Sequence, residues 1–175
     1  MSLRRILITG ATGAGISSLA AEMGRRGYEV MREPGRRVIR AETRTNGTGL
    51  PWVDPARYAR LCLRIAAADW EEARAGPVVF DRGALDAALA LHRLGQTEAA
   101  EAALNAHRYD DVFLAPPWLE LFETDEERRI DFAEASAEYD SIAEVLPAHG
   151  YAPVELPKAD IVERADWLEA RLKGG

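Results

Sequence analysis

The sequence predicts a three-layer α/β fold, in which a mainly parallel sheet of about five strands is flanked by helices. Two observations support this prediction. Short apolar runs alternate with longer segments of helical periodicity along the whole chain. The apolar runs are also continuous, as expected of strands that are buried on both faces of a parallel sheet. No internal repeat or linker interrupts the 175 residues, so we expect one domain over 1–175.

The expected elements of the first half follow one another in a regular order. Residues 6–9 form an apolar, β-branched run that ends in glycines, and a helix over 17–26 then ends at Gly27. Asp54 and Pro55 form an N-cap and first-turn pair that opens another helix, which continues up to Gly76. The remaining elements expected here are a strand at 28–32, a short helix at 36–43 and a buried strand at 78–80.

The second half continues the alternation. Thr124 and Glu127 have the spacing of a capping box and predict the start of a long helix. Pro153 places the last apolar run at an edge of the sheet, because proline cannot donate to a strand ladder. The other elements expected here are helices at 84–94 and 97–107, strands at 112–115 and 151–156, and a last helix with inward-facing residues from 161 to 172.

Composition excludes several classes of partner. Acidic residues outnumber basic ones by 29 to 22, which gives a net charge of −7 and argues against broad binding to nucleic acid or acidic membranes. No apolar stretch reaches the length of about 18 residues that spans a membrane. The single cysteine, Cys62, forms neither an internal disulfide nor a metal site, so we expect a cytoplasmic protein. A homodimer or a protein partner stays open.

The segment 10–18, GATGAGISS, lies between an expected strand and an expected helix. Glycines let backbone N–H groups turn inward around an anion, and the following helix adds the positive end of its dipole. Gly10, Gly15 and Ser17 match the phosphate-binding P-loop pattern G-x-x-x-x-G-K-[ST], but Ile16 stands at the lysine position. The missing lysine removes a charge-assisted hydrogen bond worth about 1.5–3 kcal/mol.

Two other interpretations of this loop compete with phosphate binding. Residues 9–13 look like the opening of the dinucleotide-binding loop of short-chain dehydrogenases and epimerases. The next glycine falls at the wrong place, however, and no tyrosine lies four residues before Lys158 or Lys173, which excludes that chemistry. The second alternative is a glycine-rich turn that binds nothing, because short motifs also match by chance.

Charged side chains follow the expected strands at the edge where open α/β sheets bind ligands. Asp81 ends a buried strand and is a candidate to hold Mg²⁺ through water, with capping of the next helix as the alternative. Glu33 follows the second strand and is a candidate general base or ligand of a substrate hydroxyl. Arg36 and Arg40, four residues apart, would share a helix face towards the same edge. The alternative for Glu33 and the arginines is a solvated surface residue.

Taken in order, these segments resemble the small AAA-type P-loop ATPases related to the ribosylnicotinamide kinase domain of bacterial NAD regulators. The resemblance runs from Ile6 to Leu172. Glu33-Pro34-Gly35 also looks like the corresponding turn of thymidylate kinases, and Asp81-Arg82 like the acid–arginine pair of deoxynucleoside kinases. The residues that carry the resemblance are the loop 10–18, the segments 33–36 and 80–83, the strand 111–114 with Pro117 and Trp118, and the segment 124–129.

The resemblance implies a P-loop NTPase fold with a site for ATP and Mg²⁺. Asp81 would assist the metal or act as a base, Glu33 and Arg36 would meet the acceptor, and Arg82 or Arg128 would replace the charge of the missing lysine. Arg128 with Arg129 would close over the phosphates as a helical lid, approximately residues 118–132. The loop residues implied to hold phosphates and metal are Gly10, Gly13, Ala14, Gly15, Ile16, Ser17 and Ser18, with Ser17 and Asp81 at the metal.

Two function classes follow from this pattern. In the first, the protein transfers phosphoryl groups from ATP to a small-molecule acceptor, or hydrolyses ATP, in a Mg²⁺-dependent reaction. In the second, it is a non-catalytic nucleotide- or anion-binding sensor or partner module that lost activity with the lysine. The retained acid, arginines and Ser17 favour the first class, whereas Ile16 favours the second. A variant of the first class receives the missing cation from a partner protein.

Overall fold

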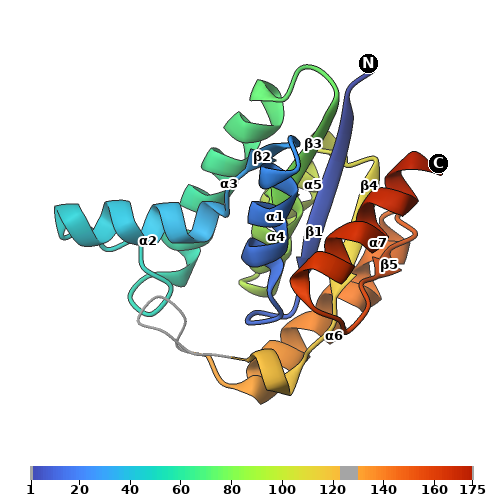
Figure 1. Ribbon diagram of the computed structural model, residues 1–175. Helices are drawn as coiled ribbons and strands as arrows, with labels where there is room; N and C mark the ends of the chain where they lie inside the picture. The colour runs from blue at the N-terminus through green and yellow to red at the C-terminus, as the bar shows by residue number, and fades with distance from the viewer. Residues whose placement is uncertain (1, 123–129, 175) are drawn as a thin grey trace.

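The computed structural model describes residues 2–122 and 130–174 and contains a five-stranded sheet (Figure 1). Every neighbouring pair of strands is parallel, in the order β2-β3-β1-β4-β5. The expected sheet of about five mainly parallel strands is therefore confirmed. The strands are β1 (Arg4–Gly10), β2 (Glu29–Met31), β3 (Pro77–Asp81), β4 (Asp111–Ala115) and β5 (Val154–Glu155).

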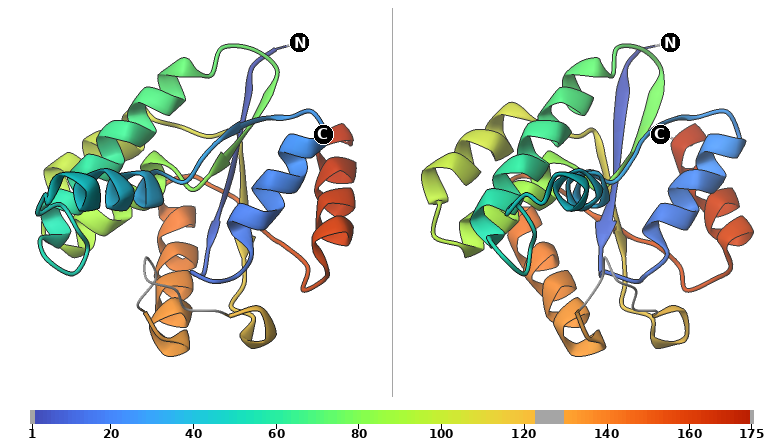
Figure 2. Two further views of the ribbon diagram at one scale, coloured as in Figure 1. Left: turned by 60° about the vertical axis from the view of Figure 1, so that its left-hand side comes forward. Right: turned by 90° about the vertical axis from the view of Figure 1, so that its left-hand side faces the viewer.

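Helices cover both faces of this sheet. Figure 2 shows α1 and α7 side by side on one face and α3, α4, α5 and α6 on the other. The helical elements are α1 (Ile16–Arg25), α2 (Pro34–Thr45), α3 (Pro55–Glu72), α4 (Ala84–Arg93), α5 (Thr97–Ala106), the 3-10 turn η1 (Leu119–Leu121), α6 (Phe132–Ala148) and α7 (Ile161–Lys173). None of the helices in the described ranges is both long and apolar enough to cross a membrane.

The two faces of the central strand supply two separate core layers. Ile6 and Ile8 belong to the apolar cluster that includes residues of α1 and α7. Leu7, which points the other way, belongs to the cluster that includes residues of α4, α5 and α6. All three side chains are fully buried. This double burial explains why the strands have continuous apolar sequences.

Some element bounds differ from the sequence-based expectation. Helix α2 begins at Pro34 rather than at Arg36, because proline fits the first helical turn. The long helix α6 begins at Phe132 with a capping box formed by Asp131 and Glu134, so its start lies later than the predicted Thr124–Glu127 box indicated. That box lies outside the described residues, as do residues 123–129 of the expected lid at 118–132, whose described part includes η1.

Other local predictions hold. The side chain of Asp54 accepts a hydrogen bond from the N–H of Arg57 at 2.9 Å and caps α3, as predicted. Strand β5 is shorter than expected, with only Val154 and Glu155, and it pairs on one side only, at the sheet edge that Pro153 predicted. The carboxyl ends of all five parallel strands therefore lie at one edge of the sheet.

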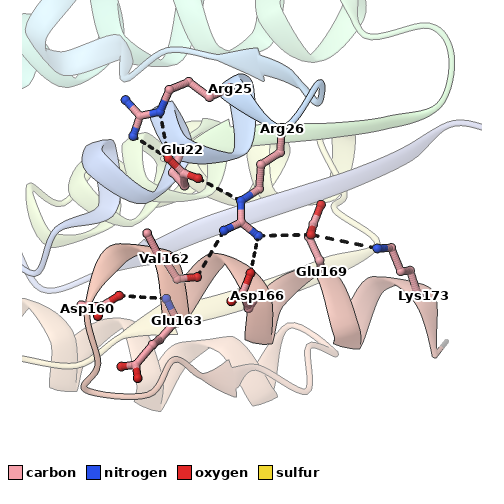
Figure 3. Close-up of polar contacts among 9 residues, drawn as sticks. All are labelled: Glu22, Arg25, Arg26, Asp160, Val162, Glu163, Asp166, Glu169 and Lys173. Carbon is pink, nitrogen blue, oxygen red and sulfur yellow. Dashed lines mark hydrogen bonds and ion pairs between the residues drawn. The ribbon is translucent and has the colours of Figure 1, made fainter.

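A network of ion pairs ties α7 to α1 (Figure 3). Arg26, at the end of α1, donates from Nη1 to Asp166 at 2.7 Å and to Glu169 at 3.2 Å, both on α7. Its Nε donates to Glu22 on α1 at 3.0 Å, and its Nη2 donates to the carbonyl oxygen of Val162 at 3.3 Å. These contacts fix the last helix against the helix that follows the glycine loop.

Candidate functional site

A cleft of about 260 Å³ lies at the carboxyl edge of the sheet, over the ends of β1, β2 and β3. Parallel strands bring their carboxyl ends together, so segments that are far apart in the sequence meet there. The structure thereby gathers most of the candidate residues predicted from the sequence. The cleft is lined by Ala11, Gly13, Gly15, Ile16, Ser17, Ser18, Glu33, Arg36, Arg40, Asp81 and Arg82.

The glycine loop forms one wall of the cleft. Gly13 and Gly15 have φ values of 80° and 77°, in the left-handed region that glycine adopts without strain. Gly15 is the N-cap of α1, and Ser17 and Ser18 lie in the first turn of that helix. The N-terminus of α1, with its unpaired N–H groups and positive dipole end, therefore begins in the wall of the cleft, a geometry suited to an anion.

Two loop residues that we predicted to bind phosphate do not line the cleft. Gly10 packs against β4 at Ala115, where no side chain fits. Ala14 is buried, and its carbonyl oxygen accepts a hydrogen bond from Arg164 on α7. Both residues support the loop from behind rather than forming its open surface.

Ile16 occupies the position that the P-loop pattern assigns to lysine. It is the first residue of α1 and is only 6 % exposed. Its side chain packs in the apolar cluster shared by α1 and α7, with Leu19 one turn further on. The same residue lines the cleft, so an aliphatic side chain stands where a cation would face phosphate.

Asp81 is a buried carboxylate at the end of β3. Its Oδ1 has no hydrogen-bond partner among the described residues. The pKa of Asp81 is raised to about 6, mainly by burial and further by the nearby charge of Glu33, although a hydrogen bond from Ser17 opposes the shift. A buried, unpartnered oxygen beside a serine hydroxyl fits the ligand preference of Mg²⁺.

The metal-binding capacity of the cleft is limited to a few oxygen ligands. Within residues 2–122 and 130–174, no group of three or more His, Cys, Asp or Glu side chains is placed to hold a metal ion. Mg²⁺ commonly takes one or two carboxylates, with waters and substrate phosphates completing its shell. Asp81 and Ser17 therefore fit a metal that arrives with a phosphate ligand.

Glu33 stands between the loop and two further cavities. Its Oε2 accepts from the hydroxyl of Ser17 at 3.4 Å and lies 3.3 Å from Nε of Arg36. It also lines a cavity of about 200 Å³ with Tyr58, and one of about 430 Å³ with Tyr58 and Trp52. A molecule in either cavity would therefore lie beside the Glu33 carboxylate, which also contacts Ser17 of the glycine loop.

Arg82 is held by the loop and by two carboxylates. Its backbone has φ 56°, and its Nη2 donates to the carbonyl oxygen of Gly10 and to the hydroxyl of Thr12, both at 3.1 Å. Its Nη1 donates to Asp86 at 3.2 Å and to Glu138 at 3.3 Å. Burial alone would lower the pKa of Arg82, but the carboxylates of Glu138 and Asp86 raise it above its ordinary value.

The sequence interpretation missed two residues that contact the loop. Glu138 on α6 accepts hydrogen bonds from the N–H and the hydroxyl of Thr12 at 3.0 Å and 2.7 Å. Nothing in the sequence distinguishes it from the other acidic residues of that helix. Arg164 on α7 did carry a signal, because it is a cation within the apolar helical stripe that runs from Ile161 through Leu168. Arg128 and Arg129, the predicted lid arginines, lie outside the described residues.

A comparison with known protein families identifies the family of this chain. The sequence pattern of the AAA domain family matches residues 5–164. The chain belongs to this family. The match covers most of the sequence and confirms the nucleoside-kinase-like P-loop resemblance inferred from the motifs. A comparison with curated proteins gives no match.

Solved structures with the same fold support this assignment. The deoxyadenosine kinase from M. mycoides is 15 % identical with a TM-score of 0.69, and the match covers 98 % of this chain and 100 % of that one. The NadR protein solved in complex with NR is 16 % identical with a TM-score of 0.69, over 96 % of this chain and 50 % of that one. A shikimate kinase from Acinetobacter baumannii is 13 % identical with a TM-score of 0.61, over 98 % and 94 % of the two chains. At these identities the similarity shows that the fold is that of P-loop kinases.

Proposed function

We propose that the protein transfers the γ-phosphoryl group of ATP to a hydroxyl of a small molecule in a Mg²⁺-dependent reaction, with hydrolysis of ATP where no acceptor is bound. The observation that carries this proposal is the cleft itself. A helix N-terminus, a serine hydroxyl and the buried, unpartnered Oδ1 of Asp81 face one space, and that space adjoins two cavities at Glu33.

In this proposal the loop residues Gly13, Gly15, Ser17 and Ser18 bind the phosphates of ATP through N–H and hydroxyl groups. Asp81 and Ser17 hold the metal, which when bound neutralises charge on the transferring phosphoryl group. Arg82 adds positive charge beside the loop, and Arg128 and Arg129 are assigned to the lid over the phosphates. The chemistry needs no covalent intermediate with the protein, because positioning and charge supply the catalysis in such enzymes.

The acceptor is assigned to the two cavities beyond Glu33. Its carboxylate would accept a hydrogen bond from the reacting hydroxyl, and Arg36 would orient that carboxylate. Trp52 and Tyr58 provide aromatic surface for a ring. The solved relatives named above include a kinase with deoxynucleotide products bound and proteins in complex with NR and with shikimate, which supports a small hydroxyl compound as the acceptor class.

We also assign the protein to the cytoplasm.

One observation favours a second candidate, a non-catalytic nucleotide sensor. Ile16 is packed into the core where the P-loop pattern has lysine, so the transferring phosphoryl group lacks that contact. Such a protein would bind nucleotides without turnover.

The test is calorimetric titration with ATP and ADP, with and without Mg²⁺, followed by phosphorus NMR of ATP mixed with nucleosides and related hydroxyl compounds. We expect Mg²⁺-dependent ATP binding and the appearance of ADP with a phosphorylated acceptor. Binding without any turnover would support the sensor, and no binding of either nucleotide would contradict both candidates.

Replacing Glu33 by glutamine is expected to weaken acceptor binding by about tenfold, because a neutral amide accepts a weaker hydrogen bond from the hydroxyl than a carboxylate does. ATP affinity should stay close to the wild-type value. The measurement is KM for the acceptor beside the Kd for ATP. Glu29→Gln is the matched control, since Glu29 is exposed at the start of β2, the strand that precedes Glu33. An unchanged KM in the Glu33 variant would remove this residue from the acceptor site.

A further inference from the structure

Arg164 is a fully buried cation behind the glycine loop. Its side chain is 0 % exposed, and its guanidinium lies between α7 and the loop. Nε donates to the carbonyl oxygen of Pro157 at 2.8 Å and Nη1 to that of Ala14 at 2.7 Å. Nη2 has no hydrogen-bond partner among the described residues.

No carboxylate of the described residues forms an ion pair with this guanidinium. The pKa of Arg164 is lowered, and burial is the cause. Removing a charge from water without a counter-ion is costly for stability, and buried charges in proteins are normally paired. The arrangement is explained if the counter-ion is a ligand.

The bond to Ala14 also fixes the orientation of the loop backbone. The carbonyl and the N–H of one trans peptide point in opposite directions. Because Arg164 holds the carbonyl of Ala14 toward α7, the N–H of Gly15 in the same peptide points away from α7. Gly15 lines the cleft, so this polarity favours an anion there.

The charge lies close to the cleft. A β-carbon built on Gly15 would lie only 3.2 Å from Nη1 of Arg164, so the guanidinium lies against a residue that lines the cleft. Charge interactions of a buried group are stronger than those between groups in solvent. Arg82 is less suited to this role, because Asp86 and Glu138 already compensate its charge.

We propose that Arg164 supplies positive charge to this phosphate site, where from behind the loop it stabilises bound phosphate by its charge and by orienting the Ala14–Gly15 peptide. It thereby supplies charge that the lysine of the P-loop pattern would supply from position 16. The proposal rests on one part of the proposed function, the binding of phosphate by the glycine loop, and it does not require turnover. Arg164 is a positioning and charge-supplying residue and is not placed in contact with the reacting atoms.

The position of Arg164 is fixed from both ends of its helix. Asp160 caps α7 by accepting from the N–H of Glu163 at 2.9 Å. Further along, Arg26 ties Asp166 and Glu169 to α1, as Figure 3 shows. Since α1 starts at the loop, the guanidinium keeps its place relative to the phosphate cradle.

The test compares binding of inorganic tripolyphosphate and of ATP by calorimetry in four proteins: wild type, Arg164→Gln, Ile16→Lys/Arg164→Gln and Arg171→Gln. We expect Arg164→Gln to weaken both ligands by about tenfold or more, as expected for loss of a charged partner. Adding lysine at position 16 should restore most of that loss. Arg171→Gln, which removes an exposed cation from the last turn of the same helix, should bind both ligands like the wild type.

Restoration of binding by lysine at position 16 distinguishes a contribution of Arg164 through charge from one through structural support of the loop. A lysine at position 16 returns a cation to the phosphate but cannot rebuild the contacts of Arg164 with Pro157 and Ala14. The proposal is wrong if Arg164→Gln binds both ligands like the wild type. It is also wrong if Arg164→Gln loses binding, circular dichroism shows that the variant is folded, and lysine at position 16 restores none of the lost binding. Wild-type binding of tripolyphosphate without any phosphoryl transfer would overturn the catalytic function and leave Arg164 in its role. Absence of binding of both ligands to the wild type would overturn both.

Discussion

Replacing Gly10 by alanine is expected to lower the free energy of unfolding by about 4 kcal/mol, which is exceptional for the addition of one methyl group. A β-carbon at this position would lie 2.3 Å from the carbonyl oxygen and 2.6 Å from the nitrogen of Ala115. Both atoms are backbone of the adjacent strand, in register with Gly10, so they cannot move without disturbing the pairing of β1 with β4. The φ of 128° adds strain for any residue other than glycine.

The measurement is urea unfolding of Gly10→Ala beside Gly27→Ala. Gly27 has φ 95°, also unfavourable for alanine, but a β-carbon there would meet nothing within 4 Å. The control therefore carries backbone strain alone, about 1–2 kcal/mol. Equal losses in the two variants would mean that β4 yields to the new methyl group, and that the close approach at Gly10 is unimportant for stability.

The parts of the fold that the sequence predicted depend on local patterns. Continuous apolar runs identified the strands, and Pro153 correctly marked an edge strand. The strands, being parallel, then place their carboxyl ends together, which is why Glu33 and Asp81 were expected to meet the glycine loop and do so in the cleft. The local sequence, together with the rule that parallel strands place their carboxyl ends at one edge of the sheet, was sufficient to predict these features.

The residues that were missed depend on contacts over long sequence separations. Glu138 reaches Thr12 across 126 positions, and Arg164 reaches Ala14 across 150. Such pairings follow from the packing of α6 and α7 on the sheet, which no local pattern encodes. The long helix begins later than predicted for a different reason: Asp131 and Glu134 form a capping box that directly precedes Phe132. The predicted box of Thr124 and Glu127 lies outside the described residues.

Asp81→Asn is expected to reduce phosphoryl transfer by about a thousandfold, because an amide lacks the charge that binds the metal, and the metal would neutralise charge on the transferring phosphoryl group. Mg²⁺ dependence of ATP binding should largely disappear, whereas binding of ATP without metal should change little. The measurements are turnover and calorimetric titration with and without Mg²⁺. Asp140→Asn, at an exposed position on α6, is the control for loss of one negative charge. Retention of full turnover in the Asp81 variant would place the metal elsewhere.

The same substitution is expected to stabilise the nucleotide-free protein. The pKa of Asp81 is about 6 in the folded protein, and its usual value is near 3.8. Between these values the folded protein keeps a proton that the unfolded chain releases, so the stability contributed by this group falls as the pH rises and is lowest above pH 6. Asparagine has no such dependence, and the variant should gain about 3 kcal/mol in urea unfolding at pH 7.5 with EDTA present. The gain should vanish below about pH 3, where Asp81 is neutral in both states. A variant less stable than the wild type at pH 7.5 would show that the carboxylate has compensating interactions in the nucleotide-free protein. A gain in stability together with a loss of turnover would show that the Asp81 carboxylate lowers stability but is required for the reaction.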